Sequence, residues 1–176
     1  MAIVKPSGSS KMAEADVKFT GYMKISDING ESTTKGFEDW ISLESLSYAV
    51  AQATTHRHTS GAVVTGRANI GDVVITKQLD IASPKLYESV LTAKQHDEAE
   101  IQLTRTVAGK NETYLTIKLT SVYVTEVGVV GGAKEGSNIP LEEVHLNFGQ
   151  ITYTYTQTAV RGGGAVEVSW DAATHA

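Results

Sequence analysis

Residues 113–127 have the sequence TYLTIKLTSVYVTEV, in which apolar and polar side chains alternate over most of the length. Leu115, Ile117 and Leu119 share one face of an extended chain, because successive side chains of a strand point to opposite sides. The alternation changes phase further along, where Val122 and Val124 carry it. This segment therefore predicts one long strand that bends near its middle.

The same period-two pattern recurs on both sides of this segment. It predicts further strands over residues 17–25, 40–48, 73–79, 100–107, 141–158 and 166–170. Within residues 141–158 the phase slips by one residue near Gly149-Gln150, and a β-bulge is the simplest explanation. Long, regularly spaced antiparallel strands, about seven or eight in all, favour a β-barrel or a sandwich.

One segment alone has a helical pattern. Ser83 suits the N-cap position and Pro84 the first helical position, and Leu86 and Val90 follow at i, i+4 spacing. Lys94 and His96 would then lie near the end of the helix, where the helix dipole favours positive charge. We expect a single short helix that plugs one end of the barrel or covers one side.

Length and composition limit the classes of function. The 176 residues suit one compact domain, which we expect over residues 16–172, preceded by a flexible polar arm over residues 1–15. A net charge of −5 makes non-specific binding to nucleic acid unfavourable. No apolar stretch approaches the length of about 18 residues that a membrane span needs.

The first residues lack the apolar core of a classical signal peptide, so we expect synthesis and folding in the cytoplasm. The chain has no cysteine, which excludes disulfides, thiolate metal sites and cysteine nucleophiles.

Four stretches resemble, in the same order, segments of the Hcp (haemolysin-coregulated protein) family. They are GYMKISDINGES at residues 21–32, VITKQLDIASPKL at 74–86, YLTIKL at 114–119 and EVHLNFGQI at 143–151. The resemblance implies a mainly β fold: an antiparallel barrel with one flanking helix, assembled into a hexameric ring with an open centre. It further implies rings stacked into the inner tube of a type VI secretion system.

The resemblance also implies the partners of such a tube. These are other copies of the chain, a contractile sheath and baseplate, a VgrG-type spike at the tip, and effector proteins carried in the lumen. The subunit would leave the cell through this apparatus, into the extracellular space or a target cell. A tail-tube protein of a phage or phage-like contractile particle has the same barrel and is the alternative; a secreted enzyme is a third hypothesis.

Candidate chemical sites are weak. His56 and His58 could share a strand face, but a structural zinc site needs four ligands. Asp97, Glu98 and Glu100 form an acidic group that we expect to be solvated, because no apolar residues surround it. Tyr153 and Tyr155, with Phe148, are more typical of packing or interface residues than of a platform for bases. We predict no catalytic residue, no metal and no cofactor.

Two segments are candidates for assembly. By resemblance, residues 46–48 belong to the strand that faces the channel, and we expect Ser45 and Ser47 to contact effectors there. Residues 52–67 are polar and have no periodicity, which predicts a long loop that becomes ordered when it docks on the next ring. The predicted ring-stacking residues are Thr54, His56, His58, Gly61, Val63, Val64 and Arg67.

Overall fold

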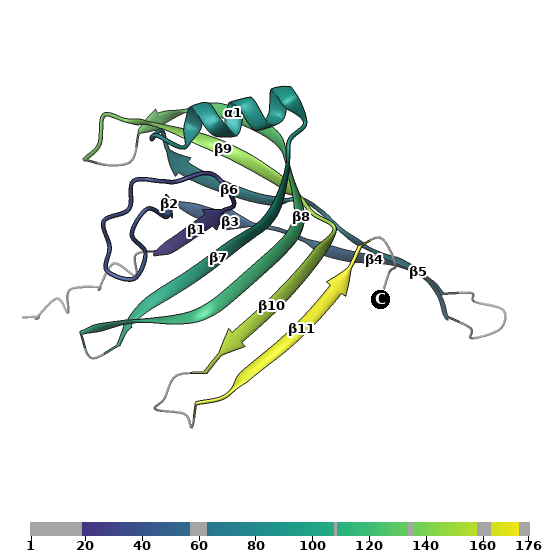
Figure 1. The fold of residues 1–176 in the computed structure, drawn as a ribbon. Coiled ribbons are helices and arrows are strands. Elements are labelled where there is room, and N and C mark those ends of the chain that lie inside the picture. Colours follow the sequence, from purple (N-terminus) through teal and green to yellow (C-terminus); the bar gives the residue numbers. More distant parts are fainter. Residues whose placement is uncertain (1–18, 57–62, 108, 134–135, 158–162, 173–176) are drawn as a thin grey trace, which may run out of the picture.

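The computed structural model describes residues 19–56, 63–107, 109–133, 136–157 and 163–172 (Figure 1). Its elements are β1 (Gly21–Ile25), β2 (Ile41–Leu43), β3 (Ser45–Ser47), β4 (Val50–His56), β5 (Val63–Ile70), β6 (Val73–Gln78), α1 (Ser83–Thr92), β7 (Gln95–Val107), β8 (Lys110–Ala133), β9 (Pro140–Asn147), β10 (Gln150–Thr156) and β11 (Ala165–Asp171). The predicted arm, residues 1–15, lies outside the described residues.

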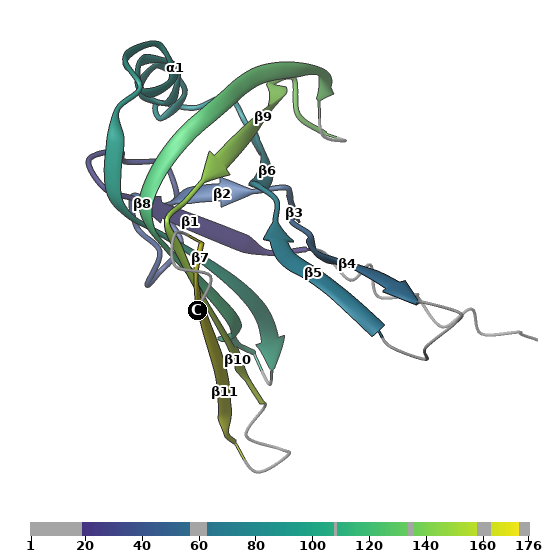
Figure 2. The same ribbon diagram turned by 90° about the vertical axis from the view of Figure 1, so that its right-hand side faces the viewer.

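The strands form an antiparallel sheet in the order β2-β1-β7-β8-β9-β6-β3. β10 also pairs with β8, and β11 pairs with β10. β4 and β5 form a separate hairpin that projects away from the curled sheet, as Figures 1 and 2 show. The prediction of a mainly β, barrel-like antiparallel fold with one helix is confirmed. Among the described strands, β2 and β3 do not pair with each other, so the barrel is not closed by hydrogen bonds between them.

β8 bends at Ser121, as the change of phase predicted. Ser121 has a positive φ of 53°, which L-residues rarely adopt outside turns and bends. The buried side chains are Leu115, Ile117 and Leu119 on one side of it and Val122 and Val124 on the other. The bend therefore inverts the facing of the strand and lets one strand serve two parts of the core.

The predicted β-bulge at Gly149-Gln150 is wrong. Residues 141–158 instead contain two strands, β9 and β10, which separate at Phe148-Gly149. Their register along β8 is unchanged across the break, because Asn147 lies opposite Tyr123 and Gln150 lies opposite Thr120. No residue is inserted. The partner strand inverts its facing beside the bend of β8, and a Cβ on Gly149 would lie 3.2 Å from the Cβ of Ser121.

α1 lies over one end of the barrel (Figure 1). It buries Leu86 completely and packs Val90 against the core. Pro84 lies in its first turn as predicted, but the N-cap residue is Ala82 and not Ser83. The helix also ends earlier than predicted, because Ala93 adopts the left-handed conformation. The next strand, β7, begins to pair with β8 at Gln95. His96 therefore belongs to β7.

The core fills the space between the curled sheet and α1. Its fully buried apolar side chains include Met23, Ile41, Ile75, Leu86, Ile101, Ile117, Leu119 and Leu146. Burial of each such side chain contributes roughly 1.5–3 kcal/mol. The described helix is too short and too polar to span a membrane.

Candidate assembly surfaces

Ser45 and Ser47 lie on a polar outer face of the sheet. Both are exposed, whereas Ile41 and Leu43 of the preceding strand are buried. One continuous strand over residues 40–48, as predicted from the sequence, would put all four side chains on one face, so that prediction is wrong. The chain turns a corner at Glu44, whose N–H donates to the carbonyl of Thr76 over 2.7 Å, and the facing inverts there.

Two cross-strand rows extend this polar face from β3 over β6 to β9. Ser45 donates a 2.8 Å hydrogen bond to the Thr76 hydroxyl, and Thr76 lies opposite Glu143. In the next row, Ser47 lies opposite Val74 and Val74 opposite His145. The His145 Nε2 is 2.9 Å from the Glu143 Oε1. The two predicted lumen residues thus belong to a wider surface of small and polar side chains.

Most of the predicted stacking loop is a β-hairpin, so the prediction of a loop over residues 52–67 is wrong. β4 and β5 pair from Val50 opposite Ile70 to His56 opposite Val63, with an irregularity between Gln52 and Thr54. Thr54, Gly66 and Arg67 are exposed. Because the described part of the hairpin stands away from the core, no buried face imposes an alternation on its sequence, and the strands were missed.

Five of the predicted stacking residues lie wholly or partly outside the part of the chain that the structure describes. His58 and Gly61 lie outside the described residues. The strand backbone of His56, Val63 and Val64 is described, but their side chains are not.

An apolar groove of about 330 Å³ lies between the base of this hairpin and the β10–β11 pair. We call it the hairpin groove; it is lined by Tyr48, Val50, Ala68, Ile70, Ile151, Tyr153, Val168 and Trp170. Val50 and Val168 are 61% and 62% exposed. Burial, and then the neighbouring Tyr153, raise the pKa of Tyr48 to about 12. The groove therefore exposes apolar side chains to solvent around a partly buried Tyr48.

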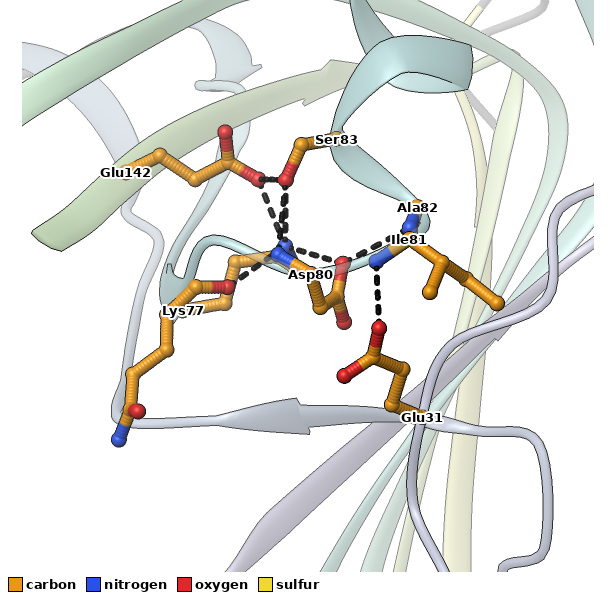
Figure 3. A network of polar contacts seen from close by, with 8 residues as sticks. Glu31, Lys77, Asp80, Ile81, Ala82, Ser83 and Glu142 are labelled. Atoms are coloured by element: carbon orange, nitrogen blue, oxygen red, sulfur yellow. Dashed lines mark hydrogen bonds and ion pairs between the residues drawn. The ribbon is translucent and has the colours of Figure 1, made fainter. Parts of the chain in front are cut away.

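A buried polar junction joins β6, α1 and β9 (Figure 3). The Lys77 Nζ lies 2.6 Å from the Glu142 Oε1 and 2.7 Å from the Asp80 Oδ1, and it donates to the Gln78 carbonyl over 2.8 Å. The Ser83 hydroxyl donates to the same Glu142 oxygen over 2.7 Å. Lys77 and Glu142 are both fully buried. The junction holds the start of the helix against the end of two strands.

Sequence reasoning did not identify this junction as a cluster. A signal was present in the spacing of Lys77, Asp80 and Ser83, which lie three residues apart around the strand-to-helix turn. Glu142 could not be predicted, because it is 65 residues away from Lys77 in the sequence. Its other oxygen, Oε2, has no hydrogen-bond partner among the described residues. The first three residues belong to one of the stretches that carry the family resemblance.

The other predicted chemical sites show little clustering. Asp97 and Glu98 are exposed on β7, as expected for solvated carboxylates. Glu100 is instead partly buried, and its Oε2 lies 3.9 Å from the Lys118 Nζ. Within the described ranges, no group of three or more His, Cys, Asp or Glu residues could hold a metal ion. Tyr153 contributes to the hairpin groove, and Phe148 is buried.

Comparison with known proteins identifies the family. The family model described as "Type VI secretion system effector, Hcp" matches residues 22–155. The chain belongs to the Hcp family. Protein hcp1 of Pseudomonas aeruginosa is 30% identical over 154 residues, which cover 85% of this chain and 93% of that protein. The major exported protein of the same organism is 28% identical over 141 residues, covering 77% and 80% of the two chains.

Solved structures agree with this assignment. A structure of a type six secretion system protein has a TM-score of 0.81 at 25% identity and covers 90% of this chain and 98% of its own. Hcp1 from Salmonella typhimurium has the same fold, with a TM-score of 0.72 at 22% identity over 90% and 97% of the chains.

The family assignment decides between the functional hypotheses. Hcp proteins are secreted tube proteins of type VI secretion systems that form hexameric rings, and they are structural proteins and not enzymes. The assignment favours the secretion tube over the phage tail tube.

Proposed function

We propose that residues 16–172 form one tube-protein domain whose hexameric rings stack into the inner tube of a type VI secretion system. A contractile sheath on a baseplate would drive the tube, a VgrG-type spike would close its tip, and effectors would occupy its lumen. The subunit would fold in the cytoplasm before export. The observation that carries this proposal is the family match over residues 22–155, and measuring the mass of the assembled ring tests it.

We assign the lateral contact within a ring to the hairpin groove and to β11. Val166 and Val168 of β11 are 68% and 62% exposed, and contiguous exposed apolar surface on a soluble protein marks an interaction site. β11 pairs with β10 alone among the described strands, and proteins usually cover such edges. A head-to-tail contact made by a fixed rotation closes into a ring.

We assign ring stacking to the β4–β5 hairpin. It projects from the barrel, and residues 49–71 contain Arg57 and Arg67 but no acidic residue in a chain of net charge −5. Beyond its base, the described part of the hairpin stands away from the core, and a two-stranded hairpin by itself is marginally stable, so docking on the next ring would order it. Its basic character suits the otherwise acidic protein surface.

Deleting residues 54–65 is expected to leave the ring intact and to abolish tubes and secretion. The deletion removes the end of the hairpin and spares the groove residues at its base, so the lateral contact survives. Electron microscopy and light scattering of the variant would measure both assemblies. Long tubes formed by the variant would contradict the stacking role, whereas loss of the ring would place the hairpin in the lateral contact.

Replacing Ser47 with Arg is expected to leave the ring intact and to impair effector loading. Ser47 is exposed on the polar face of the sheet, so the barrel can accept a larger side chain, but six long cations would narrow and charge a lumen of small polar groups. Effector co-purification with the ring measures loading, and Thr92→Arg on the exposed side of α1 is the control. Normal loading of every effector would contradict this assignment and place the lumen-facing surface on another face of the subunit.

A further inference from the structure

His96 is the one fully buried histidine among the described residues. Its ring joins three parts of the fold. The Nε2 atom lies 2.9 Å from the Ser89 hydroxyl on α1, and the Nδ1 atom lies 2.9 Å from the backbone oxygen of Ser26, which follows β1. The histidine itself is the second residue of β7 and lies opposite Val122 of β8. These are its polar contacts within the described part of the chain.

The chemistry of these partners fixes where protons can lie. The Ser26 carbonyl can only accept, so Nδ1 must carry a hydrogen. In the neutral ring Nε2 is then an acceptor, and the Ser89 hydroxyl can donate to it. When a second proton binds Nε2, the ring donates to the Ser89 oxygen, whose own hydrogen turns to the Lys85 carbonyl, 2.9 Å away. Each protonation state is fully hydrogen-bonded.

We propose that Ser89 and His96 form a proton-tolerant joint that holds α1 on the barrel whether the histidine is neutral or charged. The joint deepens the proposed function, since a subunit that is exported meets solutions of different pH. It would keep the helix docked as one proton per subunit is taken up, with a rotation of one hydroxyl group as the only change in the hydrogen bonds.

The four charged groups that line the hollow beside the joint are paired with one another. A small polar hollow above Ser89 is walled by Asp27, Lys85, Glu88 and Lys94. The Lys85 Nζ lies 2.7 Å from Glu88, and the Lys94 Nζ lies 3.4 Å from Asp27. On β7, Asp97 and Glu98 are exposed, and β8 presents apolar Val122. The hydroxyl of Ser89, and not a neighbouring charge, is thus the group that adapts to the charge of the ring.

Replacing Ser89 with Ala tests the joint, because it removes the group that adapts. The neutral ring would lose one donor, whereas the charged ring would hold a buried N–H⁺ without an acceptor, which costs more. We expect the unfolding equilibrium constant to rise at pH 8 and, because an N–H⁺ without an acceptor is the costlier loss, to rise about tenfold further at pH 5. Urea denaturation at a fixed protein concentration measures both values, since the ring's stability depends on concentration.

Thr92→Ala is the matched control. Like Ser89, Thr92 donates a hydrogen bond from its hydroxyl to the carbonyl four residues earlier, here that of Glu88 over 2.7 Å, but it has no histidine partner. It should show the same effect at both pH values. If Ser89→Ala raised the unfolding equilibrium constant equally at pH 8 and pH 5, the proposal would be overturned. Neutron diffraction of the wild-type ring gives a second test, independent of that variant's folding: a hydrogen on Nδ1 at both pH values and on Nε2 only at pH 5 is expected, and Nε2–H at pH 8 with bare Nδ1 would overturn it.

Discussion

Replacing Lys77 with Met is expected to destabilise the folded subunit by about 3–5 kcal/mol, the usual effect of removing one partner of a buried ion pair. The Glu142 carboxylate is fully buried, and after the substitution its Oε1 would keep only the Ser83 hydroxyl as a donor. An isolated carboxylate in such surroundings is very unfavourable. Chemical denaturation at a fixed protein concentration, with tryptophan fluorescence as the signal, would measure the loss.

The double variant Lys77→Met, Glu142→Leu separates the loss of the pair from the cost of the orphaned charge. Replacing a buried ion pair with apolar residues is often nearly neutral. Asp80 also loses Lys77 in this variant but is partly exposed and keeps the Ala82 N–H as a donor, so we expect the double variant to recover most of the stability. Lys85→Met is the control, since it breaks the exposed Lys85–Glu88 pair and should change little. A Lys77 variant as stable as the Lys85 variant would mean that the junction does not hold the helix.

Replacing Val168 with Asp is expected to dissociate the ring while leaving the subunit folded. Val168 lines the hairpin groove and is 62% exposed, so the isolated subunit tolerates a carboxylate there. In the proposed contact the same carboxylate would lose its water without gaining a partner, which costs several kcal/mol at each contact. Mass measurement in solution would show a shift to single chains, and circular dichroism would show a retained β signal.

Ser169→Asp provides the control on the same strand. Ser169 is on the opposite face of β11, where it shares a 2.8 Å hydrogen bond with Thr152. The Ser169→Asp variant adds the same charge one residue away from Val168, and the ring should remain intact. An intact ring for Val168→Asp with dissociation for Ser169→Asp would assign the lateral contact to the other face of β10 and β11.

The sequence predicts the sheet well where one face is buried. Leu115, Ile117 and Leu119 alternate with polar residues because the core lies on one side. The corner at Glu44 could not be predicted in the same way. One residue is enough to change the direction of the chain, and such a short break leaves no recognisable pattern of apolar residues in the sequence. The hairpin strands were missed for a related reason, since the described part of this hairpin lies away from the core.

The polar features show a second limit. Serine is a residue type that favours the N-cap position, but the Ser83 hydroxyl donates its hydrogen bond to Glu142, 59 residues away in the sequence. His96 looked like a helix-terminal cation and is a buried strand residue that bonds Ser89. In both cases a long-range contact outweighs the local preference of the side chain. The family resemblance, in contrast, needed no contacts and is confirmed over residues 22–155.

The most direct test of the account is the mass of the purified chain at micromolar concentration, measured by light scattering and checked by electron microscopy. We predict a particle of six times the 18.8 kDa of one chain, seen as a ring with an open centre. A stable single chain under these conditions, with no rings at higher concentration, would contradict the proposal that this protein builds the tube.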